Sequence, residues 1–371
     1  MRQEQEIFDE LAALCASPGY AHAIAMFCFR DNFVGFDEQL TAKDMAHFHS
    51  GSGLIRSEIS TLIGLLVRQP VDYGMPTSEV METYLGHTER LLQELHESLS
   101  RVWFKHLRPN ELTLDGHDPF SQGEVLREPI FYGGDSAYSF QYRDLAPRKY
   151  REDRDWLITN KGFSIEAARD VGHALQRMQS QKLKSTLESL RSMSPERWTM
   201  LPAFSFTARE LAERARMDFA LIERILSAFT LAPGTLNDQF RSLSDFNVTS
   251  AYPLLRGDDQ QLILFQHYSL VEALYETPFF WMFGDKHYRA EALEHRGCFT
   301  EGFSQECLER IFGRSNVYRN VDVFRKKGEK IGEIDVLVLF GNRAIVLQAK
   351  SKRLTLEARK GGLHPVPKTS S

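Results

Sequence analysis

The sequence has few features that would mark it for export, for disulfide bonding or for a membrane. Four cysteines occur among 371 residues and none forms a CxxC pair, so neither a zinc ribbon nor a disulfide framework is indicated. The N-terminus, MRQEQEIFDEL, lacks the apolar core of a signal peptide. The most apolar long stretch, Leu54–Val67, is interrupted by polar residues and is too short to span a bilayer. We therefore expect a cytoplasmic protein with no membrane association.

An excess of positive charge is also lacking. The formal net charge is −5, so any surface for nucleic acid has to be local. The chain is 42% hydrophobic and 26% charged, which is ordinary for a globular protein. Its length suggests two or three domains.

The N-terminal region, residues 1–110, is expected to be mostly helical. Apolar residues recur at helical spacing in Glu4–Cys15, and Leu54–Val67 has the composition of a buried helix. A capping hydroxyl and an early acid at Ser78-Glu79 predict the start of a helix that runs to about Lys105. This region is the expected contact for a protein partner or a second copy in a homodimer.

Residues 111–160 are rich in glycine, proline, aspartate and aromatic residues. This composition predicts a loop-rich segment, with short strands around Ile130–Tyr132 and Tyr138–Tyr142. The aromatic residues are compatible with an interface or with an ordinary core.

Residues 161–294 are again expected to be helical, beginning with a long amphipathic helix over Ile165–Leu190. Residues 206–229 predict two short helices around Arg216-Met217, an arrangement similar to a helix-turn-helix. The second helix lacks a basic face, so a simple helical hairpin is the commoner alternative. A strand is expected over Gln260–Phe265 and a helix over His267–Met282.

The C-terminal domain, residues 295–371, is expected to contain the chemistry. It begins with a helix over Thr300–Gly313 and a strand over Val317–Phe324, and Ile331–Lys350 then forms a hairpin. Gly341-Asn342 is a residue pair that favours a two-residue hairpin loop.

That loop sets the pairing of the two strands. Asp335 then lies opposite Gln348 and Glu333 opposite Lys350, with Cβ atoms roughly 5 Å apart in each pair. A loop shifted by one residue places Asp335 opposite Lys350, whereas a three-residue loop places it opposite Ala349. The run from Ile334 is apolar on both faces, which predicts a strand covered on both sides and a costly position for the acid.

These residues carry a resemblance. Asp335 followed by Gln348-Ala349-Lys350 resembles the D…(E/Q)xK signature of the PD-(D/E)xK nuclease superfamily. The QAK form is similar to that of Mrr-type restriction endonucleases, and the order of helix, strand and hairpin resembles nuclease-related (NERD) domains. The resemblance implies a restriction-endonuclease-like α/β core behind a large helical region, so α+β overall.

The resemblance also implies roles. Asp335, Gln348 and Ala349, with support from Glu333, would bind Mg²⁺ or Mn²⁺ through oxygen atoms, and Lys350 would orient the attacking water. The family adds an acid from the preceding helix. Glu301 lies at the flank of its apolar face and is preferred, and the alternatives are Glu306, Glu309 or a merely solvated helix surface.

The implied substrate is DNA, in restriction, defence or repair. Residues 343–360 carry six basic residues against one acid, and Arg343, Lys352 and Arg353 are the expected contacts to the phosphate backbone. The family fold continues with a helix and a further strand, but Gly361 to Pro367 do not favour a helix. The domain is therefore expected to be incomplete. A catalytically inactive, nucleic-acid-binding or regulatory protein is the alternative function, and an Asp335–Lys350 ion pair without catalysis is the alternative site.

Overall fold

The computed structural model describes residues 2–32, 53–106, 123–133 and 137–351, together with residues 356 and 360. Within these ranges the fold is mixed α+β, as expected, with two three-stranded antiparallel sheets among many helices. The chain divides into two compact units, and each is discontinuous in sequence. The first comprises Met1–Ser139, Ala167–Ala273 and Leu354–Ser371, and the second comprises Phe140–Glu166 and Leu274–Arg353.

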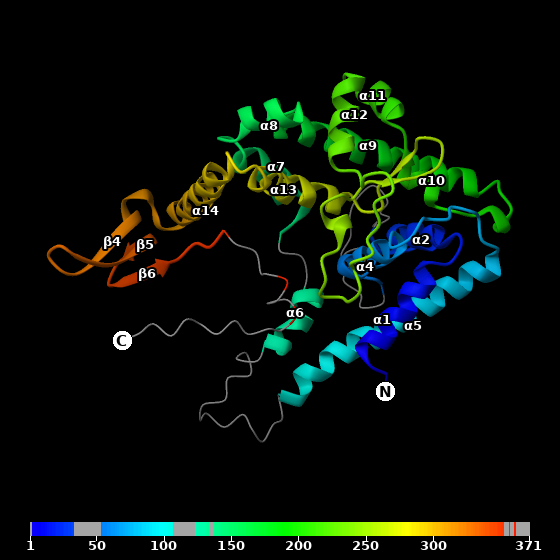
Figure 1. Cartoon of the computed structure of the whole chain (residues 1–371), viewed down its shortest axis with the longest axis horizontal. Coiled ribbons are helices and arrows are strands. Elements are labelled where there is room, and N and C mark those ends of the chain that lie inside the picture. Colours follow the sequence, from blue (N-terminus) through cyan, green and yellow to red (C-terminus); the bar gives the residue numbers. More distant parts are fainter. Residues whose placement is uncertain are drawn as a thin grey trace. The chain divides into compact units, whose positions relative to one another are not determined.

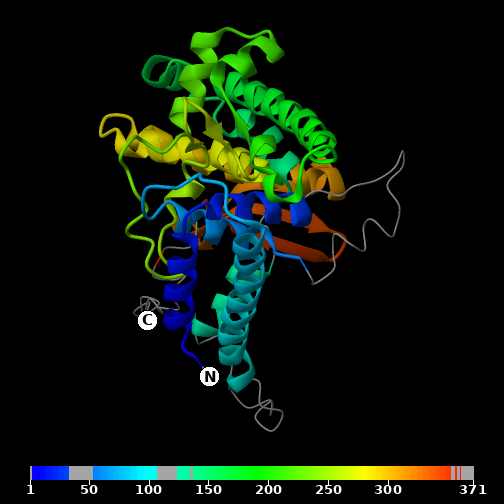
Figure 2. The same cartoon turned by 90° about the vertical axis from the view of Figure 1, so that its right-hand side faces the viewer.

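The N-terminal part of the first unit is a helical layer, and its helices follow the sequence-based prediction closely. They are α1 (Glu4–Cys15), α2 (Tyr20–Asn32), α4 (Arg56–Leu66) and α5 (Ser78–His106). Helices α1 and α5 lie side by side (Figures 1 and 2). Ile7, Phe8 and Leu11 bury one face of α1, and they join the α4 and α5 leucines in one core.

The region between residues 111 and 160 differs from its prediction. Its described part is helical: η2 (Gly123–Leu126), α6 (Arg127–Tyr132), α7 (Ser139–Lys149) and α8 (Arg154–Lys161). The strands expected around Ile130–Tyr132 and Tyr138–Tyr142 are therefore wrong. In α7 the buried residues Tyr142, Ala146 and Lys149 recur at helical spacing, so burial of that face prevailed over the β-propensity of the aromatic residues.

The rest of the first unit surrounds a small sheet. Its helical elements are α9 (Ile165–Leu190), η3 (Pro195–Arg197), α10 (Leu201–Phe204), α11 (Ala208–Ala215), α12 (Phe219–Ala228), η4 (Val248–Ser250) and the start of α13 (His267–Gly284). Its strands are β1 (Ser205–Phe206), β2 (Leu255–Arg256) and β3 (Leu262–Ile263), in the order β1-β3-β2. The predicted pair of short helices at 206–229 is confirmed, and the strand expected over Gln260–Phe265 is shorter.

Helix α13 continues through Pro278, because side chains of the second unit bond to the backbone around the proline. Proline lacks the N–H that would continue the helical ladder and displaces the turn before it. Tyr275 O in that turn accepts hydrogen bonds from Lys149 Nζ and from the Tyr150 hydroxyl, both at 2.7 Å. The N–H of Phe279 donates to the Tyr150 oxygen at 3.2 Å. These bonds replace the helical ones, so the helix does not end at the proline.

The second unit ends in the C-terminal sheet, whose elements are α14 (Arg289–Phe312), η5 (Arg314–Asn316), β4 (Val317–Lys326), β5 (Glu329–Phe340) and β6 (Arg343–Leu347). The strands are antiparallel in the order β4-β5-β6, beside α14 (Figure 1). Val317, Val336 and Val338 form a small core with Leu308 and Phe312 of α14. Helix α14 begins before His295, so the predicted domain start lies inside a helix.

Two expectations about chemistry and environment can be compared with the structure directly. All four cysteines are free thiols, as their spacing indicated. No single helix in the described ranges is long and apolar enough to cross a membrane, and α1 and α2 meet that test only as a pair bent by 106°.

Candidate functional site

The C-terminal hairpin has the predicted register. Gly341-Asn342 forms the loop, with Gly341 at a φ of 61°, and Phe340 pairs with Arg343. A positive φ at the first loop residue is what a tight hairpin turn requires, and glycine adopts it without strain. The ladder continues to the pair of Val336 with Leu347, where β6 ends.

Beyond Leu347 the chain contacts β5 through side chains. Gln348 Nε2 donates to the carbonyl of Glu333 at 2.6 Å. The backbone N–H of Ala349 donates to Asp335 Oδ2 at 2.7 Å. Asp335 therefore holds the backbone of Ala349, and Gln348 holds the backbone of Glu333, through these two bonds and not through continued strand pairing. Because Gln348 uses its amide nitrogen here, its carbonyl oxygen remains a potential ligand atom.

The two faces of the sheet differ. Side chains alternate across a strand, so Asp335 lies on the face opposite to Val336 and Val338. Helix α14 covers the valine face. On the other face Leu339 is 45% and Val346 58% exposed. Leu337, next to Asp335 on that face, is half-buried, so among the described residues this face is covered less completely than the valine face, where Val336 and Val338 are fully buried. Asp335 itself is half-buried.

Glu301, the preferred helix acid, lies on the covered face. Its Oε2 accepts a hydrogen bond from Arg319 at 3.0 Å. Arg319 pairs with Val336 in the ladder and therefore shares the face of that valine. The sheet separates Glu301 from Asp335, because α14 packs on the side that Asp335 faces away from. The structure does not bring these two acids together.

The two alternative helix acids are also paired with other groups. Glu306 forms ion pairs with Arg148 and Arg310, and the Arg148 guanidinium holds the pKa of Glu306 below its usual value. Glu309 accepts from Gln305 at 2.7 Å. The helical periodicity of the sequence indicates which side chains lie outside the apolar face of α14, but it does not indicate which groups those side chains bond.

Glu333 is exposed and lies opposite Asp322 in the ladder. Lys330 Nζ bridges the two acids, at 2.8 Å from Glu333 and 2.5 Å from Asp322, and these bonds raise the pKa of Lys330. The carboxylate of Glu333 is therefore neutralised locally. Its backbone carbonyl, which holds Gln348, is the part of Glu333 that contributes to the site.

Four cationic candidates belong to the predicted site, and the structure describes two of them. Lys350 is exposed at the end of the segment that Asp335 holds. Arg343 is exposed beside the hairpin loop, where it pairs with Phe340 and so lies on the face of Val338, opposite to that of Asp335. Lys352 and Arg353 lie outside the described residues.

Arg296 of α14 supports the segment after Lys350. Its guanidinium donates to the carbonyl of Ser351 and lies over the ring of Phe279, 4.2 Å from the ring centre. Sequence analysis missed Arg296, because nothing in the sequence relates an arginine on a helix to a carbonyl 55 positions later.

The candidate ligand atoms of the site are of the chemical type that binds a hard divalent cation. They are the oxygen atoms of the Asp335 carboxylate, the Gln348 side-chain carbonyl and the Ala349 backbone carbonyl. In the described part of the chain, no three His, Cys, Asp or Glu side chains are grouped so as to hold a metal ion. A cation here would have one carboxylate and would keep several waters, a pattern that suits Mg²⁺.

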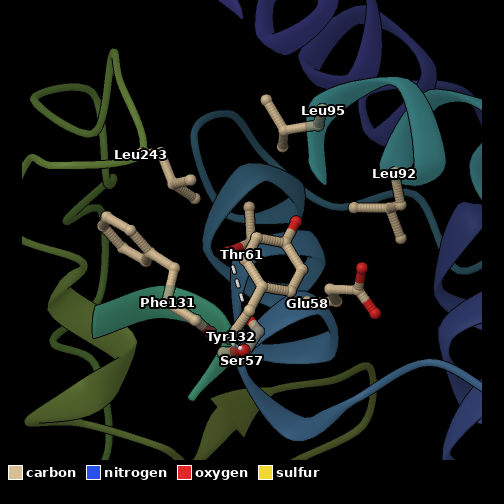
Figure 3. A pocket seen from close by; sticks show the side chains of 8 residues that line it. All are labelled: Ser57, Glu58, Thr61, Leu92, Leu95, Phe131, Tyr132 and Leu243. Carbon is tan, nitrogen blue, oxygen red and sulfur yellow. Dashed lines mark hydrogen bonds between the residues drawn. The ribbon is translucent and has the colours of Figure 1, made fainter. Parts of the chain in front are cut away.

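A second cluster of ionisable groups lies in the first unit, at a small pocket between α4, α5 and α6 (Figure 3). Glu58 accepts the N–H of Ile55 at 2.9 Å, and burial raises the pKa of Glu58. Tyr132 stacks on His96 with the rings 3.8 Å apart, and Ser57 donates to the Phe131 carbonyl at 2.6 Å. The pocket has room for about one water molecule. The pocket is therefore too small for a substrate, and the contacts around it hold α6 in place.

Comparisons of the chain with protein-family models, with characterised proteins and with solved structures found no match.

Proposed function

We propose that this protein is a metal-dependent nuclease that hydrolyses DNA phosphodiester bonds at the C-terminal hairpin. The observation that carries the proposal is the bond from the Ala349 N–H to Asp335 Oδ2 at 2.7 Å. It holds the backbone of the Gln348-Ala349-Lys350 segment against the acid, just beyond the end of β6. Restriction, defence and repair are the processes in which such an activity would serve.

Each residue has a defined part in the proposed reaction. Asp335, Gln348 and Ala349 would hold Mg²⁺ or Mn²⁺, and the bound ion supplies charge neutralisation at the phosphate and a more acidic water. Lys350 is exposed beside them and would donate to a non-bridging phosphate oxygen and orient the attacking water. Arg296 acts as a positioning residue, since it holds the backbone directly after Lys350.

The test is a cleavage assay of the full chain on supercoiled and linear DNA, with Mg²⁺, with Mn²⁺ and with EDTA. Asp335→Ala and Lys350→Ala are expected to abolish cleavage that depends on the metal. Lys327→Ala is the matched control, because Lys327 is also an exposed lysine of the same sheet, in the turn between β4 and β5. Absence of cleavage with both metals, or cleavage that survives in both site variants, would overturn the proposal.

A second candidate function is nucleic-acid binding without cleavage. One observation favours it: Arg319 and Lys330 already pair with Glu301 and Glu333, so Asp335 is the single unneutralised carboxylate of the site among the described residues. This function predicts DNA binding that needs no metal and is unchanged in Asp335→Ala. The same assay, combined with a binding measurement in EDTA, separates the two functions.

A further inference from the structure

A second surface suited to duplex DNA lies in the first unit, far along the sequence from the hairpin. The two short helices α11 and α12 lie next to each other (Figure 1) and, in the order of the chain, fall between strand β1 and the hairpin of β2 and β3. Strand β3 occupies the centre of the sheet and pairs with β1 on one side and β2 on the other. The strand that precedes the helix pair and the hairpin that follows it thus form one sheet. This arrangement is a helix-turn-helix with an attached β-hairpin wing.

The helix pair is held rigidly by its caps. Thr207 accepts the N–H of Glu210 at 3.1 Å at the start of α11. Arg216 ends that helix in the left-handed region, with a φ of 55°. Asp218 then accepts the N–H groups of Ala220 and Leu221 at the start of α12. A turn of three residues therefore joins two capped helices, as in DNA-binding helix-turn-helix motifs.

Helix α12 has one buried and one exposed face. Ile222, Ile225 and Leu226 are buried. The exposed stripe follows the helical spacing i, i+3, i+4, i+7 and consists of Ala220, Glu223, Arg224 and Ser227.

The side chains of this stripe belong to the types that read base edges in the major groove. Arginine bonds to guanine, glutamate accepts from cytosine, serine bonds to several bases and alanine contacts the thymine methyl group. The major groove of B-DNA also has the width to admit an α-helix. We propose that α12 reads a short duplex sequence in the major groove and so selects the target of this protein.

The charges around α12 are arranged to permit this contact. Glu210 is paired with Lys182 at 3.1 Å and with Arg214 at 3.2 Å, and Asp218 is directed to the amides of α12. Two of the acids near the helix pair are therefore satisfied internally. Arg216 is exposed in the turn before α12, and the exposed Arg209 lies over the ring of Phe219 at the start of α12, 5.5 Å from the ring centre, so both are available to phosphates.

The wing, which is the hairpin of β2 and β3, opposes part of the attraction between the arginines and the DNA phosphates. Its turn, Gly257–Gln261, exposes Asp258 and Asp259 and carries no basic residue. Between residues 207 and 228 four arginines are balanced by four acids. The sequence-independent attraction to phosphates is therefore weak, and binding at α12 depends on the correct base sequence and responds only modestly to salt.

The experiment selects duplexes from a randomised library with the full chain in EDTA, and then measures affinity for the selected and a scrambled duplex by fluorescence anisotropy. We expect an enriched sequence whose affinity falls at least about tenfold in Arg224→Ala. Arg90→Ala, an exposed arginine on α5, is the matched control and should leave affinity unchanged. Asp258→Asn with Asp259→Asn should raise affinity at low salt, because two charges that repel phosphates are removed.

Sequence-specific binding by α12 is a property separate from the proposed cleavage. It is tested without cleavage, since no step of the measurement needs a metal or Lys350. Loss of cleavage in Asp335→Ala with selection intact would leave this inference standing. Absence of an enriched duplex, or equal affinity in Arg224→Ala and wild type, would overturn it. Capture of a protein ligand through α12 in place of DNA would also overturn it.

Discussion

The bond between Asp335 and Ala349 permits a test that separates the structural and the chemical role of one carboxylate. Asp335→Ala removes both the charge and the acceptor of the Ala349 N–H. Asp335→Asn removes the charge but keeps an oxygen that can accept the same bond. Both variants should lose metal-dependent cleavage, because a neutral side chain is a poor ligand for Mg²⁺.

The structural effect should differ between the two variants. A hydrogen bond to a charged acceptor contributes about 1.5 to 3 kcal/mol, and the half-buried position of Asp335 favours the lower value. A loss of about 1.4 kcal/mol corresponds to a factor of ten in the local opening equilibrium. The amide of Ala349 should therefore exchange with solvent about tenfold faster in Asp335→Ala and at nearly the wild-type rate in Asp335→Asn.

Hydrogen exchange with mass spectrometry of a peptide covering residues 345–351 measures this effect, and a peptide from α1 serves as the internal reference. Equal exchange in both variants would show that the bond does not hold the segment. Cleavage at the wild-type rate in Asp335→Asn would refute the assignment of the carboxylate as a metal ligand.

Three further predictions concern other groups. Glu301→Gln should leave the rate of cleavage within about twofold of wild type, because Glu301 bonds to Arg319 on the face of the sheet opposite to Asp335. A loss of cleavage as large as that in Asp335→Ala would contradict this placement. Burial raises the pKa of Glu58, so the folded protein keeps that proton to higher pH than the unfolded chain, and stability falls as pH rises from about 4.5 through the folded-state pKa. Glu58→Gln should therefore be more stable than wild type to urea at pH 7 and no more stable at pH 4, and an advantage that persists at pH 4 would argue against a titrating side chain. Tyr150→Phe removes two hydrogen bonds to the backbone of α13 next to Pro278. It should lower the free energy of unfolding of the second unit by about 2 kcal/mol in urea titrations. An unchanged midpoint of urea unfolding would exclude a role for the Tyr150 hydroxyl in that helix.

Local signals in the sequence were sufficient for much of the fold. The periodicity of apolar residues located α1, α4, α5 and α9, since a helix that buries one face must repeat at its own pitch. The Gly341-Asn342 pair specified the register of the hairpin, because few residue pairs suit a two-residue loop and the position of the loop sets the pairing.

The same reasoning failed where burial competed with local preference. Tyr142 and its neighbours have the composition of a strand, yet they lie in α7, because the side chains to be buried recur at helical spacing. A proline commonly breaks a helix, but Pro278 does not break α13. The contacts from Lys149 and Tyr150 that bridge it come from α7 and the turn that follows it, more than 120 positions away in the sequence.

For the candidate site, the sequence by itself determined the register of the hairpin, because strand alternation and a two-residue loop are local properties of the chain. The bonds from Gln348 to the Glu333 carbonyl and from Ala349 to Asp335 do not follow from that register. Only the tertiary structure decided which face of the sheet α14 covers. That choice depends on long-range burial of Val336 and Val338, and it separates Glu301 from Asp335.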